Sequence, residues 1–162
     1  MTGSTGEARS FPYSADENAR VLILGSMPGA ESLRQQQYYA FRHNAFWRIM
    51  GELFDFSPTT PYPERLAILT RHRIALWDVL AECDRPGSLD SAIRAPRPND
   101  IAGLVKKLPH LEKILCNGGA ARNYLRRFFP ELDAQQLPST SPAAARFTYA
   151  EKLFRWRAAL GR

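Results

Sequence analysis

The sequence predicts an α/β protein whose central, four-stranded and mostly parallel sheet lies between two layers of helices. Short apolar segments alternate along the chain with segments of helical periodicity, as in proteins whose parallel strands are joined by crossover helices. The length of 162 residues suits one domain. We therefore expect a three-layer α/β/α domain over residues 11–162. Residues 1–10 are small and polar, without the apolar segment of a secretory signal, and are expected to be a flexible tail.

The first strand is predicted at Val21–Gly25, a continuous apolar segment typical of a strand buried on both faces. An amphipathic helix is expected over Asn44–Phe54, where apolar residues recur at helical spacing. A second helix is expected over Pro61–Arg71, because Pro63 and Glu64 suit the first turn of a helix.

The middle of the chain predicts one more strand and one more helix. Ile74–Leu80 reads as the second strand, running into a loop. Glu82–Pro98 holds three prolines and one glycine, so we expect it to be mostly loop. A helix is expected over Ile101–Leu108, with Asn99 or Asp100 as its cap.

The last third of the chain repeats the alternation. A third strand is expected at Leu111–Cys116 and a helix at Ala120–Phe129. A short fourth strand is expected at Gln135–Pro138, followed by a final helix over about Tyr149–Leu160.

Three polar loops follow predicted strands, at Gly25–Gly29, Asn117–Gly119 and Ser139–Ala143. In open parallel sheets, ligands bind beyond the C-terminal ends of the strands. We therefore expect these loops to converge on one site. In the first loop, two glycines allow close backbone approach, and its N–H groups can hold an anion or a base carbonyl. A plain turn between a strand and a loop is the alternative interpretation.

An aromatic cluster surrounds Asn44, including Tyr39 and Phe41. Aromatic rings can stack on a nucleic-acid base, and an amide beside them can place a water molecule. Core packing is the alternative for Phe46 and Trp47, and helix capping is the alternative for Asn44.

The net charge of +6 is unevenly placed. Residues 1–110 hold 13 Lys/Arg against 12 Asp/Glu, whereas residues 111–162 hold 9 against 4. A basic surface attracts phosphate-rich partners, although a merely solvated basic face is an even alternative. Arg146, Lys152 and Arg155 are the candidate phosphate contacts, again with solvated surface as the alternative.

The two cysteines, Cys83 and Cys116, and three scattered histidines form no zinc-like or iron–sulfur spacing. We expect no metal, no cofactor and no membrane span, since no apolar stretch is long enough to cross a bilayer. Both cysteines are expected to be small buried hydrophobes, and the cytoplasm is the simplest compartment.

Taken together, several motifs resemble the uracil-DNA glycosylase superfamily, and within it the hypoxanthine-DNA glycosylase (DNA-deoxyinosine glycosylase) branch. These motifs span nearly the whole chain after the tail: Leu22–Gly29, Tyr38-Tyr39, Asn44–Trp47, Leu76–Leu80, Gly87–Ser91, Asn117-Gly118 and Pro138–Ala143. The resemblance implies an enzyme that hydrolyses the N-glycosidic bond of a flipped, deaminated DNA base, most of all hypoxanthine. It also implies DNA as partner; we expect a monomer.

The resemblance also implies roles for residues. Uracil-excising members carry an Asp or Asn in the first loop that positions the attacking water, but here that position is Met27, which cannot hold a water. The hypoxanthine branch shares this departure and has an Asn before Phe-Trp, so the catalytic role is carried to Asn44. Asn117 matches a base-contacting position, together with the loop residues Gly25, Ser26, Met27 and Pro28.

Ser139, Thr140, Ser141, Pro142 and Ala143 match the motif that grips the DNA backbone and fills the gap left by the flipped base; Arg146 is expected to contact phosphate. The His of uracil-specific members is absent there, which makes strong uracil excision less expected. Either Tyr39 or Phe41 is expected to stack on the base.

Several alternatives stay open. Asp78 and Asp90 are rival catalytic residues, although we favour a loop-capping role for Asp78. The chain is alternatively a glycosylase for uracil, xanthine or mismatched bases, or a non-catalytic nucleic-acid-binding relative. A hydrolase of small substrates is disfavoured, because the sequence has no G-x-S-x-G motif.

Overall fold

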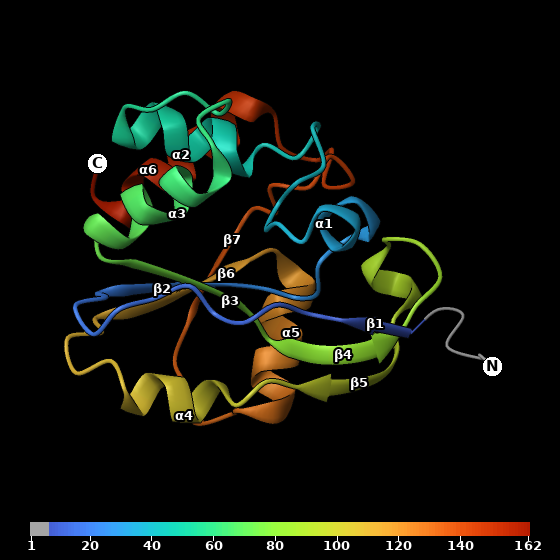
Figure 1. The fold of residues 1–162 in the computed structure, drawn as a ribbon. Helices are drawn as coiled ribbons and strands as arrows, with labels where there is room; N and C mark the ends of the chain where they lie inside the picture. The colour runs from blue at the N-terminus through green and yellow to red at the C-terminus, as the bar shows by residue number, and fades with distance from the viewer. Residues whose placement is uncertain (1–6) are drawn as a thin grey trace.

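The computed structural model describes residues 7–162 and contains the predicted parallel sheet (Figure 1). Its strand order is β3-β2-β6-β7. Strand β2 (Val21–Gly25) pairs in parallel with β3 (Ile74–Asp78) on one side and β6 (Lys113–Asn117) on the other, and β6 pairs in parallel with β7 (Gln135–Leu137). All four strands therefore end at the same edge, and the predicted fold class is confirmed.

Helices cover both faces of this sheet (Figure 1). One face carries α2 (Phe46–Phe54), α3 (Tyr62–Arg71) and α6 (Tyr149–Leu160), which pack in one hydrophobic cluster. The other face carries α4 (Ile101–Lys106) and α5 (Gly119–Phe128), which pack in a second cluster. The five helices predicted from periodicity are confirmed, with ends that differ by a few residues.

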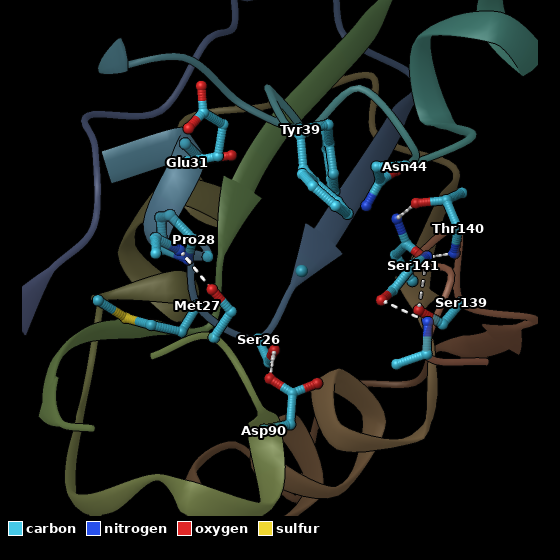
Figure 2. Close-up of a pocket in the computed structure, with 18 of the residues that line it drawn as sticks. Ser26, Met27, Pro28, Glu31, Tyr39, Asn44, Asp90, Ser139, Thr140 and Ser141 are labelled. Carbon is cyan, nitrogen blue, oxygen red and sulfur yellow. Dashed lines mark hydrogen bonds between the residues drawn. The ribbon is translucent and has the colours of Figure 1, made fainter. Parts of the chain in front are cut away.

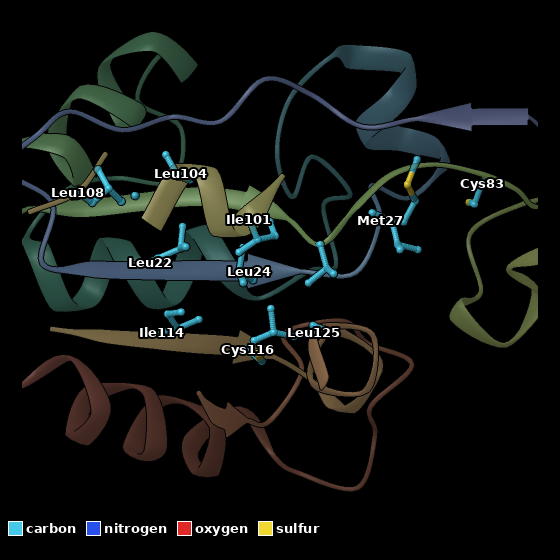
Figure 3. Packing of buried hydrophobic residues seen from close by; sticks show 14 of the residues in the cluster. Leu22, Leu24, Met27, Cys83, Ile101, Leu104, Leu108, Ile114, Cys116 and Leu125 are labelled. Atoms are coloured by element: carbon cyan, nitrogen blue, oxygen red, sulfur yellow. The ribbon is translucent and has the colours of Figure 1, made fainter. Parts of the chain in front are cut away.

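The alternation along β2 explains why its sequence is apolar throughout. Leu22 and Leu24 belong to the cluster on the α4/α5 face, together with Ile101 and Leu125 (Figure 3), whereas Ile23 belongs to the cluster on the opposite face. All three β2 side chains are fully buried. A central parallel strand has no solvent-facing side, so it needs apolar residues at every position.

The expectation that Glu82–Pro98 is mostly loop is right only for residues 85–93, because both ends of the segment form strands. A second, antiparallel sheet of order β1-β4-β5 forms from β1 (Glu7–Arg9), β4 (Leu80–Asp84) and β5 (Arg94–Pro98). Strand β5 is mostly exposed and lies at the edge of this sheet, where proline is tolerated because one side of the strand needs no partner. Because β5 contains prolines and has no apolar pattern, its sequence did not predict a strand.

The expected tail is also shorter than predicted. Residues 7–9 pair with β4 and bury Ala8 opposite Cys83, so they belong to the folded domain. The part of the tail at residues 1–6 lies outside the described residues. A short helix, α1 (Ala30–Gln35), was also not predicted, and it follows the loop after β2.

Cys83 and Cys116 are both completely buried and free, which confirms them as small core residues. Among residues 7–162, no helix is both long and apolar enough to cross a bilayer.

Leu24→Ala should lower the free energy of unfolding by about 2–5 kcal/mol, because a fully buried leucine leaves a cavity in a packed core. Urea unfolding measures this change. Phe154→Ala is the control, since Phe154 is 73% exposed on α6 and should change stability by less than about 0.5 kcal/mol. Equal effects of the two substitutions would contradict the assignment of the core.

Candidate active site

A cavity of about 500 Å³ opens where the four parallel strands end (Figure 2). Its walls come from the loop after β2, the segment between α1 and α2, the ends of β3 and β6, the loop after β7, and the segment around the short helix η1 (Asp90–Ala92). Every residue predicted for the site lines this cavity except the candidate phosphate contacts Arg146, Lys152 and Arg155. The three polar loops therefore converge as expected.

The loop Gly25–Gly29 forms one wall with its backbone. A Cβ atom on Gly25 would lie 2.5 Å from Asp78 Oδ1 and 3.1 Å from the Tyr39 hydroxyl oxygen, so no larger residue fits without a shift. Among residues 7–162, the N–H groups of Met27 and Gly29 donate to no other residue. They are available to a ligand.

Contacts from the segment after β4 hold this loop in place. Ser26 Oγ donates to Asp90 Oδ1 at 2.7 Å, and the N–H of Ala30 donates to Ser88 Oγ at 2.7 Å. The buried guanidinium of Arg85 donates to the carbonyl of Pro28. The segment between β4 and β5, expected to be mostly loop, therefore supports the loop Gly25–Gly29 at the cavity.

The side chain of Met27 supplies no polar group to the cavity. It is 7% exposed and packs in the same hydrophobic cluster as Cys83 (Figure 3). Although it lines the cavity, its thioether cannot hold a water as a carboxylate or amide does.

Thr140 connects three parts of the site. Its N–H donates to Asn117 Oδ1 at 2.9 Å, and its hydroxyl accepts from Asn117 Nδ2 at 3.0 Å. Its carbonyl accepts from the N–H of Ala45 at 2.9 Å, immediately beside Asn44. These bonds fix the rotamer and orientation of Asn117.

Thr140 was expected to contact DNA, but its side chain cannot do so because the residue is completely buried. Its loop neighbours are different. Pro142 and Ala143 are exposed, and Ser139 and Ser141 bond the backbone of the same loop. Lys152, a candidate phosphate contact, is also buried and donates to the carbonyl of Ser141, so it supports the loop from below.

Asn44 lies at the cavity just before α2 (Figure 2). Its Oδ1 accepts a hydrogen bond from the N–H of Phe46 at 3.0 Å. One lone pair of this oxygen therefore caps the start of the helix, as the alternative interpretation expected. Its Nδ2 bonds no other residue among residues 7–162. The capping bond orients the amide, and the second lone pair of Oδ1 remains available to a water.

Tyr39 and Phe41 occupy different depths of the cavity. Tyr39 stacks on buried Phe46 with ring centroids 4.0 Å apart, and its hydroxyl is sealed from solvent without a partner in the described chain. Its φ of 56° is unusual for an aromatic residue and turns the ring inward. Phe41 is 44% exposed and contacts only the edge of His43 among the aromatic rings described.

Asp78 ends β3 at the cavity and is 3% exposed. Its carboxylate accepts no hydrogen bond within residues 7–162, so the loop-capping role favoured from the sequence is wrong. Burial and, to a smaller extent, nearby Asp90 raise the pKa of Asp78 to about 7, against the opposing effect of Arg85. A buried carboxyl without a partner is costly, which makes Asp78 a candidate functional residue.

Two exposed cations, Arg146 and Arg155, lie on the C-terminal segment. The guanidinium groups of Arg146 and Arg155 each lie 5.3 Å from the centre of the Phe147 ring, and both residues are exposed. Among residues 7–162, no group of three or more His, Cys, Asp or Glu side chains is arranged to hold a metal ion.

Sequence reasoning missed Arg85 and Ser88 and underestimated Asp78. Asp78 left a signal of its own, as an acid at the end of an apolar strand, where parallel sheets place functional groups, whereas Ser88 appeared only within the motif Gly87–Ser91 without a role. Ser88 and Arg85 act through contacts more than 50 residues away in sequence, which no local pattern reports.

Asp78→Asn should stabilise the protein at pH 8 and much less at pH 4.5. Because the pKa of Asp78 is raised from 3.8 to about 7, the folded state keeps a proton that the unfolded state releases, and stability falls as pH rises through this window. The slope is at most about 1.4 kcal/mol per pH unit. Urea unfolding at both pH values measures it, with Asp84→Asn, an exposed acid on β4, as control. A difference that does not change with pH would contradict the raised pKa.

Comparison with known proteins agrees with this geometry. The family model described as the uracil DNA glycosylase superfamily matches residues 11–159. A hypoxanthine DNA glycosylase of Methanosarcina acetivorans is 42% identical over 144 residues, covering 86% of this chain and 90% of that protein. One of Methanosarcina barkeri is 38% identical over 117 residues, covering 72% and 74%.

A solved structure shows the same fold. A solution NMR structure from M. acetivorans, provisionally named as a uracil DNA glycosylase, superposes with a TM-score of 0.82 and 39% identity. The match covers 95% of this chain and 96% of the other. With the cavity at the ends of the parallel strands and the family match over nearly its whole length, this chain belongs to the uracil DNA glycosylase superfamily.

Proposed function

We propose that this protein is a monofunctional DNA glycosylase that releases a flipped, deaminated base, most of all hypoxanthine, and leaves an abasic site. The observation that carries the proposal is where the side chains of Met27 and Asn44 lie relative to the cavity. The side chain at the loop position that should hold water packs in the core, while the amide of Asn44, from the segment before α2, lines the same cavity. The two Methanosarcina relatives with the hypoxanthine name support the choice of base.

The base must leave the duplex before it can reach this cavity, since its glycosidic bond is inaccessible inside the stack. A cavity of about 500 Å³ lies within the range of small-molecule sites and has room for a purine. Tyr39 is partly exposed although its hydroxyl is sealed, and Phe46 covers one face of its ring. The other face of Tyr39 is therefore the surface on which the base stacks, and Phe41 lies at the rim.

Bond cleavage leaves positive charge on the sugar and negative charge on the base. The free N–H groups of Met27 and Gly29 stabilise that negative charge, because preorganised donors need no reorganisation during the reaction. Asn117 adds its amide group, in an orientation fixed by Thr140.

Asp78 meets the amide edge of the base. With a pKa of about 7, its un-ionised form offers a donor and an acceptor side by side. Hypoxanthine carries an adjacent carbonyl oxygen and N–H on its six-membered ring, which satisfy both. Uracil carries a similar pair, so Asp78 alone does not separate the two bases.

Asn44 orients the attacking water through the free lone pair of its Oδ1. An amide is a weak base, but water adding to a cation-like sugar needs little proton abstraction in the transition state. Asn44 therefore acts by placing the water rather than by removing its proton.

The DNA backbone is held by the loop Ser139–Ala143 and by the exposed Arg146 and Arg155. Phosphate contacts of this kind position the duplex without reading its sequence. The protein acts as a monomer in the cytoplasm, where two buried free cysteines are stable.

The proposal is tested with purified protein and duplexes that carry one deoxyinosine, deoxyuridine, deoxyxanthosine or mismatched thymidine. Alkali cleaves the strand at any abasic site that forms. We expect the deoxyinosine duplex to react fastest. Faster reaction of another base would correct the substrate, and DNA binding without any abasic product would identify a non-catalytic relative.

Asn44→Ala should reduce the single-turnover rate on deoxyinosine by roughly 10²-fold or more, the effect of losing one preorganised polar group. It should also lower stability by about 1 kcal/mol, because the cap of Phe46 is lost.

Asn44→Ser separates the two effects. A serine oxygen can still cap the helix but does not reach as far into the cavity, so stability should return while activity stays low. Near-normal turnover by Asn44→Ala would rule out the catalytic assignment.

A further inference from the structure

Arg85 is a buried cation behind the loop Gly25–Gly29. It follows β4, is 3% exposed, and donates through one terminal nitrogen to the carbonyl of Pro28. Its Nε and its other terminal nitrogen, Nη1, are sealed from solvent and have no hydrogen-bond partner among residues 7–162. Arg85 also forms no ion pair with a carboxylate in that part of the chain. The fold therefore keeps a positive charge at this position without neutralising it.

This charge is more than the loop needs for its support. The carbonyl of Gly25 accepts from the N–H of Val79 at 2.8 Å. The carbonyl of Ser26 accepts from the N–H of Leu80 at 3.1 Å. These neutral donors hold the loop, whereas a buried guanidinium with unpartnered nitrogen atoms lowers the stability of the folded state. A buried group kept at such a cost needs an explanation beyond holding the loop, and a role in the reaction is one.

The hydrogen bond from Arg85 fixes the direction of the next peptide N–H. Pro28 and Gly29 share one peptide group, and the described chain has no cis peptide bond, so the carbonyl oxygen and the N–H of this group point in opposite directions. The carbonyl oxygen points to Arg85, so the N–H of Gly29 points away from it, and this N–H has no partner among residues 7–162. Gly29 lines the cavity and Arg85 does not. Arg85 therefore faces the cavity across this peptide group.

We propose that Arg85 is a positioning residue that stabilises the negative charge of the departing base through the peptide group of Pro28 and Gly29. A cation at the carbonyl oxygen polarises the peptide group, which makes its N–H a stronger hydrogen-bond donor. When the glycosidic bond breaks, its electron pair leaves with the base and water adds to C1′ of the sugar. The proton that this water loses balances the charge of the base afterwards. This inference rests on the proposed base excision and adds to it a charge that lies outside the cavity.

The charge of Arg85 also reaches the cavity directly. Burial and Asp90 raise the pKa of Asp78, and Arg85 is the group that opposes them. Because Arg85 is buried and Asp90 is exposed, water screens the field of the cation less than that of the anion. The cavity is therefore prepared for an anion, which the base becomes only as its bond breaks. Such a charge stabilises the transition state more than the bound substrate.

The test compares Arg85→Met, Arg85→Lys and Arg97→Met in two measurements. The first is the single-turnover rate of base release from a deoxyinosine duplex. The second is the affinity for a duplex that carries the 9-deaza analogue of deoxyinosine, whose base cannot leave because a carbon–carbon bond holds it to the sugar. Arg97 is the matched control, since it is exposed on β5 and pairs with Glu82 at 2.6 Å.

We expect Arg85→Met to lower the rate about tenfold or more and to leave the affinity for the uncleavable duplex unchanged, because the base carries negative charge only as its bond breaks. Arg85→Lys should recover most of the rate, since lysine keeps the charge and a donor. Arg97→Met should match the wild type in both measurements.

A purely structural role for Arg85 predicts a different result. If Arg85 only supports the loop, Arg85→Met should lower the rate and the affinity together, and that result would overturn the proposal. An Arg85→Met variant as fast as the wild type would overturn it as well. So would an Arg85→Lys variant as slow as Arg85→Met, because the charge would then not be what the reaction needs.

A second readout separates this inference from the proposed function. The NMR signal of the Asp78 carboxyl carbon follows its protonation whether or not a base is released. Because Arg85 lowers the pKa of Asp78, Arg85→Met should raise that pKa above its wild-type value. A rise would support a charge that reaches the cavity even if no duplex reacts. An unchanged pKa would contradict the inference even if the enzyme is active.

Discussion

The cavity depends on the hydrogen bonds of one residue, Thr140. Its side chain and N–H hold the amide of Asn117 at the end of β6, and its carbonyl holds the N–H of Ala45 at the start of α2. It thereby fixes the distance between the proposed base-binding amide and Asn44. Because Thr140 is completely buried, these bonds form without competition from water.

The parallel sheet makes this junction possible. Strands β2, β3, β6 and β7 end at one edge, so loops distant in sequence meet there. The loop after β2 then provides backbone N–H groups, while its one long side chain, Met27, packs into the core. Polar chemistry is left to Asn44, Asp78 and Asn117, which reach the cavity from three other segments. In this account, the groups that hold the base are therefore different from Asn44, which places the water.

Much of this arrangement could be predicted from the sequence. Strands β2, β3 and β6 have an apolar pattern that follows directly from burial on both faces, and the loops at the strand ends could be placed by topology alone. Asn44 and Asn117 could be named only through resemblance to a family, because an isolated Asn before a helix predicts a cap as readily as a catalytic group. In the structure, Asn44 both caps the start of α2 and lines the cavity.

What escaped prediction depends on contacts between distant segments. Strand β5 is exposed and rich in proline, so nothing in its sequence distinguishes an edge strand from a loop. The unpartnered state of Asp78 and the burial of Lys152 are likewise properties of the packed chain. Both side chains looked like surface or capping groups, since the sequence shows a charge but not what surrounds it.

The central claim, that Thr140 orients the amide that binds the base, is tested most directly by comparing Thr140→Val with Thr140→Ser. Valine keeps the shape and the backbone bond to Asn117 but removes the hydroxyl, whereas serine keeps the hydroxyl. In single-turnover release of hypoxanthine, measured well below the melting temperature of each variant, the valine variant should be slower by about tenfold or more. The serine variant should stay close to the wild type. A valine variant as fast as the wild type would contradict the account.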